Sequence, residues 1–185
     1  DDDLTKHIGA SLWRLFEHYL HTTDKHLLDA AVAKYRHIYR DGPMFEYDIY
    51  DGVLEALQAL RQQNMRVVIA TAKAHEYARE VVMTGGLGPY IHPVYGSELD
   101  GSNVEKPDLI RHVLATEQKT AAQAVMVGDR HHDMHGAAAN GVRSIGVLYG
   151  YGTLDELHAA TRLVDSATEL PAVIDDLLPD TLTTP

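Results

Sequence analysis

Two aspartates follow a short apolar run in the second half of the chain. The run at 125–127 stops at Gly128, and Asp129 and Asp133 come next with a spacing of four. Such a run is typical of a buried strand, and open α/β sheets bind ligands at the carboxyl ends of their strands. Two carboxylates there suit a hard cation such as Mg²⁺. The pattern is equally consistent with a loop Asp that only caps a helix over 132–140, because Asp is a preferred N-cap.

Two other element ends carry candidate residues. The apolar run at 65–70 leads to Thr71. Its hydroxyl could hold a phosphate together with backbone N–H groups of the next helix, or it could cap that helix. Lys106 stands just before Pro107 at the expected start of a helix, where a lone lysine is usually solvated. Lys106 has a functional interpretation only when it is considered together with the other candidate residues.

The elements that must position these residues alternate along the chain. Apolar residues at helical spacing predict a helical hairpin over residues 1–42, which ends at Asp41-Gly42-Pro43. Beyond it we expect helices from about 53 and at 74–83, 106–117, 133–140, 153–160 and 168–178, and strands at 65–70, 91–95, 124–127, 144–148 and 163–164. This alternation predicts right-handed crossovers and an α/β fold, a Rossmann-like parallel sheet flanked by helices.

Composition narrows the classes of function. The chain has 16 basic and 27 acidic residues, a formal charge of -11, and no basic block, which makes nucleic-acid binding an unlikely role. It has no cysteine, so disulfides, zinc-thiolate sites and a thiol nucleophile are excluded. No run approaches the roughly 18 apolar residues of a membrane span. We therefore expect a soluble, cytoplasmic protein without nucleic-acid or membrane partners, either a monomer or a homodimer.

The order of the candidate residues resembles the haloacid dehalogenase-like (HAD) hydrolase superfamily. Thr71, then Lys106 about 35 residues on, then Gly128-Asp129-x-x-x-Asp133 about 23 later, are similar to its second, third and fourth motifs. Within the superfamily the chain looks like the phosphoglycolate phosphatase group. That similarity extends to the segments at 50–57, 70–73, 95–101 and 146–152.

The resemblance implies a role for each residue. Thr71, with Ala72 beside it, would bind the transferring phosphoryl group, and Lys106 would neutralise charge on the nucleophile and the phosphate. Thr71 and Lys106 are thus the expected catalytic residues. Asp129 would bind Mg²⁺, supported by Asp133. These roles suit the chemistry, because a phosphoryl transition state spreads negative charge over its oxygens and is stabilised by cations.

The resemblance also implies a domain plan and an activity. Residues 1–42 would be part of a small helical cap, 43–178 the α/β hydrolase core, and 179–185 a loose tail. The activity implied is Mg²⁺-dependent hydrolysis of a small phosphate monoester, such as phosphoglycolate, through an aspartyl-phosphate. A nucleotidase or pyrophosphatase of the same superfamily is the alternative. A haloacid dehalogenase is disfavoured by the second carboxylate, and a phosphorelay receiver by the order of the residues.

One part of the family pattern is absent. The first motif, Asp-x-Asp-Gly-Thr, supplies the nucleophile, and the run Asp1 to Asp3 does not match it, since no apolar strand precedes it and Leu4 replaces the glycine. In the family the strand of that motif lies between the strands that end at Thr71 and Gly128. Without it two inner strand edges would be unpaired, which is costly. We expect a further N-terminal segment in the natural protein; the alternative is an inactive fragment that binds phosphate or a partner.

Histidines and aromatic residues receive a structural interpretation. The histidines around Asp133 predict an exposed loop and helix start in place of a metal site; they are His131, His132 and His135. Four aromatic residues at helical spacing near the N-terminus are expected to be packing groups, although one or two could contact a substrate; they are Trp13, Tyr19, Tyr35 and Tyr39.

Overall fold

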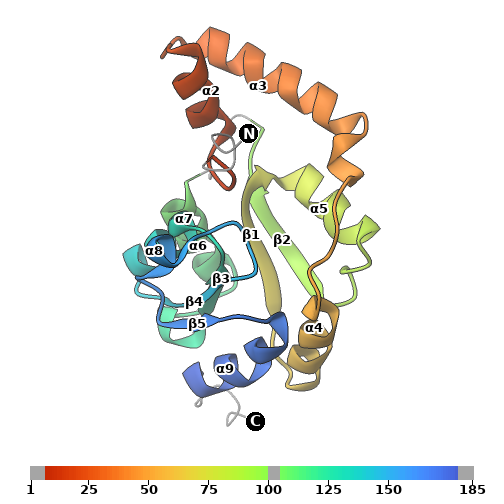
Figure 1. Ribbon diagram of the computed structural model, residues 1–185, viewed down its shortest axis with the longest axis vertical. Helices are drawn as coiled ribbons and strands as arrows, with labels where there is room; N and C mark the ends of the chain where they lie inside the picture. The colour runs from red at the N-terminus through yellow and green to blue at the C-terminus, as the bar shows by residue number, and fades with distance from the viewer. Residues whose placement is uncertain (1–6, 100–104, 179–185) are drawn as a thin grey trace.

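The computed structural model describes residues 7–99 and 105–178, and its first regular elements are two helices, α2 (Leu12–Leu20) and α3 (Lys25–Arg40). They pack against each other (Figure 1). A left-handed His21 ends α2, and the Asp24 carboxylate caps α3 by accepting a 2.9 Å bond from the backbone N–H of His26. The predicted helical hairpin is therefore confirmed over 12–40, while residues 1–6 lie outside the described residues.

A first parallel pair of strands follows. Its elements are the 3-10 turn η1 (Pro43–Phe45), α4 (Val53–Gln62), β1 (Val67–Ala74), α5 (His75–Thr84) and β2 (Ile91–Ser97). The ladder runs from Val67 opposite Ile91 to Thr71 opposite Gly96, and then becomes irregular before Ala74. The helix between the two parallel strands makes this a βαβ connection, the alternation that the sequence predicts.

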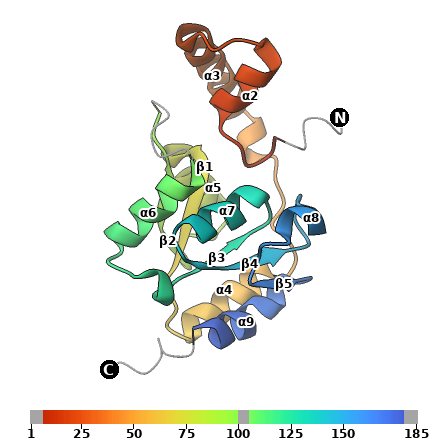
Figure 2. The same ribbon diagram turned by 90° about the vertical axis from the view of Figure 1, so that its left-hand side faces the viewer.

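The second sheet has the order β3-β4-β5, with all neighbours parallel. Its elements are α6 (Lys106–Thr116), η2 (Ala121–Gln123), β3 (Val125–Gly128), α7 (His131–Ala139), β4 (Arg143–Val147), α8 (Leu154–Leu157), β5 (Arg162–Val164), η3 (Ala167–Glu169) and α9 (Leu170–Leu177). Helices flank both sheets (Figures 1 and 2), so the predicted α/β class is confirmed.

Apolar side chains hold the two sheets in one body. One cluster packs α9 and the end of α4 under β4 and β5, where Ile145 is 0% exposed. A second cluster joins α4, α5 and β2 through residues such as Leu57 and Ile91. Val53 and Val67 touch both clusters. Because removing apolar surface from water is favourable, these shared contacts hold β1 beside the second sheet.

The sheet is divided in two where the sequence analysis expects unpaired edges. In the described part of the chain β1 pairs with β2 alone and β3 pairs with β4 alone. A cavity of about 2450 Å³ is lined by all of 67–74 and by all of 125–128. Both strands stay half-buried there, whereas β4 is buried from Ser144 onward. We call this cavity the groove between β1 and β3.

Three boundaries differ from the expectations. β1 continues to Ala74, past the predicted end at 70, because pairing with β2 carries the chain on. The helix predicted at 153–160 is only α8, since the N–H of Thr161 bonds to the Ser144 carbonyl and returns the chain to the sheet. The helix predicted at 168–178 is divided into η3 and α9, whose first turn contains Pro171.

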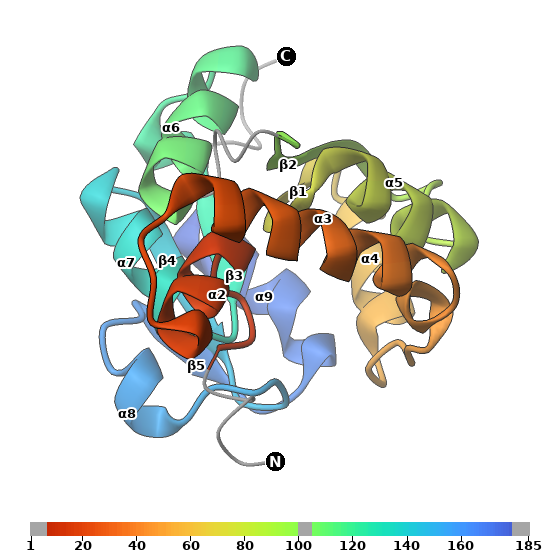
Figure 3. The same cartoon turned by 90° about the horizontal axis from the view of Figure 1, so that it is seen from above.

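The helical pair α2 and α3 lies over the carboxyl ends of the strands (Figure 3). Lys73 near the end of β1 contacts Tyr39 of α3, and Arg130, two residues after β3, bonds to the carbonyl of Ile8 before α2. The strand ends and their candidate residues are therefore covered on that side. None of the helices in 7–99 and 105–178 has the length and hydrophobicity that a bilayer span requires.

Candidate active site

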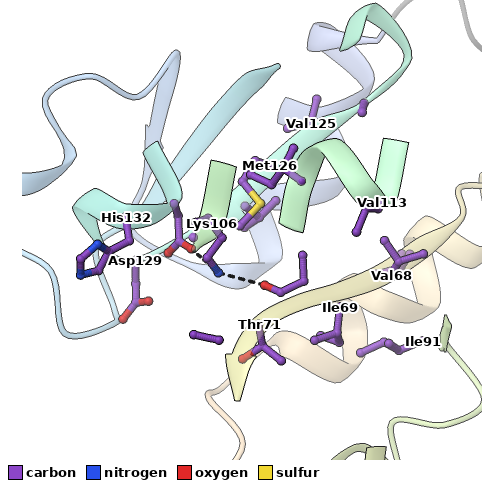
Figure 4. Close-up of a pocket in the computed structure, with 18 of the residues that line it drawn as sticks. Val68, Ile69, Thr71, Ile91, Lys106, Val113, Val125, Met126, Asp129 and His132 are labelled. Carbon is purple, nitrogen blue, oxygen red and sulfur yellow. Dashed lines mark hydrogen bonds and ion pairs between the residues drawn. The ribbon is translucent and has the colours of Figure 1, made fainter. Parts of the chain in front are cut away.

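Lys106 and Asp133 form a buried ion pair at the centre of the site. The Lys106 Nζ lies 2.8 Å from Asp133 Oδ1, and the two side chains are only 11% and 10% exposed. The same amine donates a 2.9 Å hydrogen bond to the carbonyl of Ala70, next to Thr71 (Figure 4). Gly136 gives room for the lysine, because a Cβ there would lie 2.5 Å from its Cγ. Lys106 therefore links α7 to the end of β1.

Thr71 lies within β1, not at the start of α5. Its Oγ1 accepts a 3.1 Å bond from the backbone N–H of Lys73, and α5 instead has Ala74 at its N-cap without a side-chain bond. The helix-cap interpretation of Thr71 is therefore wrong. The hydroxyl proton is left for donation toward the groove. Neighbouring Ala72 also lines the groove, and its carbonyl accepts from the Ser97 hydroxyl at 2.9 Å.

Asp129 is held from one side only. Its Oδ2 accepts a 2.8 Å bond from the backbone N–H of Tyr151, and within the described ranges no partner bonds to Oδ1. The loop after β4 approaches so closely that a Cβ on Gly150 would lie 2.4 Å from the Asp129 Cβ, and one on Gly152 only 1.8 Å from its carbonyl oxygen. Both positions need glycine, since real Cβ atoms essentially never approach so near. One carboxylate oxygen of Asp129 is thus available to a ligand.

Asp133 serves the helix as well as the site. Besides pairing with Lys106 it accepts a 3.2 Å hydrogen bond from the backbone N–H of Arg130 through Oδ2, at the start of α7. The N-cap residue of α7 is Arg130, so neither aspartate is a loop Asp that only caps the helix: Asp133 lies in the first turn and also pairs with Lys106. Gly128 allows this approach, because a Cβ there would lie 2.4 Å from the Asp133 carboxyl.

These groups fit a magnesium ion. Mg²⁺ prefers oxygen ligands and is commonly held by one or two carboxylates together with substrate phosphates and water. Asp129 offers a carboxylate oxygen beside the groove, and the second carboxylate of Asp133 lies four residues on at the same strand end. No cluster of three or more His, Cys, Asp or Glu side chains suited to a metal occurs within the described residues. The donor set therefore fits an ion that substrate oxygens help to hold, and Asp129 is the carboxylate that could contact it directly.

Arg130 is a residue to which the sequence analysis gave no role. It is 3% exposed, its Nε and Nη2 each bond at 3.0 Å to the Glu156 carboxylate, and its Nη1 bonds at 2.9 Å to the Ile8 carbonyl. Burial acts to raise the pKa of Glu156, but the hydrogen bonds and charge of Arg130 outweigh it and the pKa is lowered. The only sequence signal was a basic residue between the two aspartates.

One cavity-lining ring differs from the expectations, and a second lies beside Asp129 without having been predicted. His132, which was expected to be exposed, is half-buried and lines the groove beside Asp129 (Figure 4). Burial, followed by the neighbouring His131, lowers the pKa of His132. Tyr149 lines the same cavity, where burial and then the charge of Asp129 raise its pKa. The other two histidines of the cluster are exposed, as expected.

The aromatic residues of the N-terminal helices divide into two groups. Trp13, Tyr35 and Tyr39 line the cavity, whereas Tyr19 packs against His7 with ring centroids 5.3 Å apart. The predicted packing role is therefore clear for Tyr19. The other three lie where a substrate could reach them.

Several known proteins are similar to this chain in sequence. Residues 1–147 match the sequence profile of a family described as haloacid dehalogenase-like hydrolase. The chain is 42% identical over 129 residues to a 5'-nucleotidase of Pseudomonas aeruginosa, in an alignment that covers 70% of this chain and 58% of that protein. It is 32% identical over 146 residues to a phosphoglycolate phosphatase of Cupriavidus necator, with coverages of 78% and 63%.

A solved structure agrees along nearly the whole chain. The crystal structure of a predicted phosphatase from Clostridium acetobutylicum matches with a TM-score of 0.89 and 33% identity, over 95% of this chain and 82% of that one. The chain spans less than two thirds of the length of the two curated relatives. The chain therefore belongs to the haloacid dehalogenase-like hydrolase superfamily, in the group that resembles the phosphoglycolate phosphatases.

Proposed function

We propose that this chain is the larger part of a Mg²⁺-dependent phosphatase that hydrolyses small phosphate monoesters through an aspartyl-phosphate. The observation that carries the proposal is the position of the buried Lys106 amine, 2.8 Å from Asp133 and 2.9 Å from the carbonyl next to Thr71. A desolvated cation there can stabilise negative charge that develops on a phosphoryl group. Membership of a hydrolase family supports the same activity.

Each residue has a role in this proposal. The Thr71 hydroxyl and the Ala72 backbone N–H donate hydrogen bonds to the phosphoryl oxygens, and Lys106 neutralises their charge. Asp129 holds Mg²⁺ directly, and Asp133 supports it while orienting Lys106. The bound ion would add positive charge beside the transferring group.

The nucleophile would come from outside this sequence. The groove between β1 and β3 has an unpaired strand edge on each side, and its volume of about 2450 Å³ exceeds the roughly 300–1,000 Å³ of ordinary ligand pockets. We infer that a parallel strand fills it and delivers an aspartate beside Asp129. The shorter span of this chain relative to its curated relatives supports this inference.

The reaction would then have two steps. A carboxylate oxygen of the added aspartate attacks phosphorus, the ester P–O bond breaks, and the alcohol leaves with a proton from a second acid on the same strand. Water then attacks the aspartyl-phosphate, which releases inorganic phosphate and restores the carboxylate. The chain of residues 1–185 alone would bind phosphate without turnover.

Phosphate release by the complete protein tests the proposal. We expect turnover of a phosphomonoester panel to require Mg²⁺, and Asp129→Ala to reduce kcat/KM about 100-fold or more. Asp48→Ala, an exposed carboxylate away from the groove, is the matched control and should keep full activity. Turnover that is unchanged by EDTA would contradict the mechanism.

The identity of the substrate rests on the relatives. Phosphoglycolate is our first candidate, because the chain falls in the group that resembles the phosphoglycolate phosphatases. A nucleoside 5'-monophosphate is the second candidate, and the higher identity to the Pseudomonas 5'-nucleotidase supports it. The cytoplasmic location and the choice between monomer and homodimer stay predictions.

A further inference from the structure

The end of β1 leaves the regular ladder at the residues proposed to bind phosphate. Thr71 lies opposite Gly96. The next pair in the register joins Ala74 to Ser97, so residues 72–73 have no counterpart on β2. Such an insertion is a β-bulge, and bulges change the direction of side chains and are over-represented next to active sites. The backbone groups of this bulge therefore need hydrogen-bond partners from outside the ladder.

Gly96 lets the bulge pack closely against β2. A Cβ at position 96 would lie 2.6 Å from the carbonyl oxygen of Lys73 and 2.7 Å from the backbone nitrogen of His75. Both contacts are to backbone atoms, so no change of rotamer could relieve them. Glycine at this position thus keeps the bulged backbone within reach of the next residue of β2, which is Ser97.

Ser97 supplies one of the missing hydrogen bonds. Its hydroxyl donates a 2.9 Å bond to the carbonyl of Ala72, and the residue is 1% exposed. A buried carbonyl without a ladder donor requires a donor from elsewhere. Ser97 is not among the described residues that line the groove, so its hydroxyl does not reach a bound substrate. What Ser97 holds is the backbone of β1.

A single peptide group connects Ser97 to Thr71. The peptide between Ala72 and Lys73 has its carbonyl bound to the Ser97 hydroxyl at 2.9 Å. The N–H of the same peptide donates a 3.1 Å bond to Thr71 Oγ1. Since a peptide group is planar and rigid, fixing its carbonyl also fixes the direction of its N–H. Donation to the carbonyl also polarises the N–H and strengthens the second bond.

The direction of this chain of hydrogen bonds is fixed by the groups in it. A carbonyl only accepts and a backbone N–H only donates, so Thr71 Oγ1 is the acceptor in its bond with Lys73. The Thr71 proton therefore points away from that bond. Thr71 lines the groove (Figure 4), where an oxygen of a bound phosphoryl group would accept from it.

We propose that Ser97 is a positioning residue for phosphate binding, which acts through the peptide of residues 72–73 to direct the Thr71 hydroxyl proton at the phosphoryl group. This inference rests on the proposed phosphatase activity, in which Thr71 binds that group. A serine that only stabilised β2 would have no such effect on the reaction. The sequence analysis included Ser97 only within a segment similar to the family, because its partner is 25 residues away.

A double-mutant cycle in the complete protein with Mg²⁺ tests the inference, on the phosphate ester that the unmodified protein hydrolyses fastest. We expect Ser97→Ala to reduce kcat/KM about 10-fold and Thr71→Val to reduce it about 100-fold. In the Thr71→Val background, Ser97→Ala should change kcat/KM less than about threefold, since the hydroxyl that it positions is gone. Ser97→Cys, which places a weak donor there, should lie between serine and alanine.

Amide hydrogen exchange at Lys73 gives a second readout that does not depend on turnover. In Ser97→Ala the Lys73 N–H should exchange about 10-fold faster than in the unmodified protein, because its bond to Thr71 is no longer held in place. The amides of β4 should keep their protection and serve as the internal reference. An unchanged Lys73 amide would overturn the inference.

A second buried serine provides the matched control. Ser144 is 4% exposed and lies in β4, and it is not among the described residues that line the groove. Ser144→Ala should change kcat/KM less than about twofold and leave the Lys73 amide as it is.

The outcomes separate this inference from the proposed activity. An equal loss of kcat/KM from Ser97→Ala in the wild-type and Thr71→Val backgrounds would overturn the inference, since Ser97 would then not act through Thr71. Failure of the phosphatase proposal is a different result, namely no Mg²⁺-dependent phosphate release from any ester by the unmodified protein, with the Lys73 amide still sensitive to Ser97→Ala.

Discussion

Lys106 is held between Asp133 and the carbonyl of Ala70, in a place where neither charge of the pair is well solvated. The Coulombic attraction of such a pair roughly compensates for the loss of hydration. Removal of one partner is different, because it leaves the other charge buried and alone. Removal of one partner is therefore expected to lower the free energy of unfolding by more than the intact pair contributes to it.

Lys106→Met should lower the free energy of unfolding by about 3–5 kcal/mol, measured by urea denaturation in EDTA. The double variant Lys106→Met/Asp133→Leu should recover part of that loss, since no lone charge remains. Lys25→Met, which breaks the exposed pair with Asp29, is the control and should cost less than about 1 kcal/mol. Equal effects of the two single variants would contradict the buried-charge argument.

Gly150→Ala tests the close approach of the loop to Asp129. The new Cβ would overlap the aspartate, so we expect a loss of about 1–3 kcal/mol in stability and a weaker Mg²⁺-induced rise in Tm. Gly42→Ala is the control, because nothing lies within 4 Å of a Cβ there. A Gly150→Ala protein that keeps the full response to Mg²⁺ would show that the loop does not position Asp129.

The sequence could predict the residues that mark strand ends, since an apolar run followed by Asp129 or Thr71 is a local signal. It could not assign a role to Arg130. The partners of that arginine are 26 and 122 residues away, and a contact of that kind depends on the whole fold. The sequence showed Gly150 only as part of a segment similar to the family. Glycine is needed there because the Asp129 side chain, which follows another strand, approaches position 150 in the fold.

At the scale of elements, Arg130 joins three segments of the chain. Its backbone starts α7, its guanidinium binds Glu156 of α8, and the same group holds the Ile8 carbonyl before α2. Since a fork of this kind binds a carboxylate with two parallel bonds, the orientation of α8 relative to α7 is fixed. The segment leading into the helical pair is tied to the same point.

The lowered pKa of Glu156 makes this junction sensitive to acid. A carboxyl whose folded pKa lies below its unfolded value contributes stability above the unfolded pKa, near 4.5, and loses it as pH falls through the folded pKa. Glu156→Gln should therefore be less stable than the wild type by on the order of 1 kcal/mol at pH 7, with the gap closing below about pH 4.5.

Urea unfolding curves of both proteins between pH 7 and pH 3 provide the measurement. Asp48→Asn is the matched control, since Asp48 is exposed. A gap between Glu156→Gln and the wild type that persists unchanged at pH 3 would mean that the ionised form of Glu156 is not the stabilising one.

Element types were predictable from periodicity, and their ends were less so. The helix after β4 stops early because Thr161 bonds to Ser144 of the sheet, and β1 runs long because β2 continues beside it. In both cases the element ends where it does because of a hydrogen-bonded partner elsewhere in the chain, which the local sequence does not show. The predicted boundaries therefore fail where tertiary pairing overrides local preference.

At the scale of the molecule, the strands of the described residues form two sheets, and the groove lies between β1 and β3. The free edges of β1 and β3 present backbone N–H and C=O groups that require partners, and each one left unpaired when buried costs about 1–3 kcal/mol. Burial of the apolar side chains that line the groove would also favour a segment bound there. Order in this region of the fold thus depends on what occupies the groove.

Amide hydrogen exchange should show this dependence. In the chain of residues 1–185 we expect the amides of β3 to exchange faster than those of β4, which has a neighbouring strand on both sides. In the complete protein the proposed strand should bring the protection of β3 up to that of β4. The β4 amides serve as the internal reference, and equal protection of β3 and β4 in the shorter chain would contradict the view that the groove is unfilled.

If a strand with the proposed nucleophile fills the groove, the complete enzyme is one that can be split. A cut ahead of α2 would separate a small piece with the proposed nucleophile from a large piece with the lysine, the threonine and the metal carboxylates. Neither piece could turn over an ester alone. Fused to two proteins that associate, the pieces would restore phosphate release only when those proteins meet, so enzyme turnover would report the encounter.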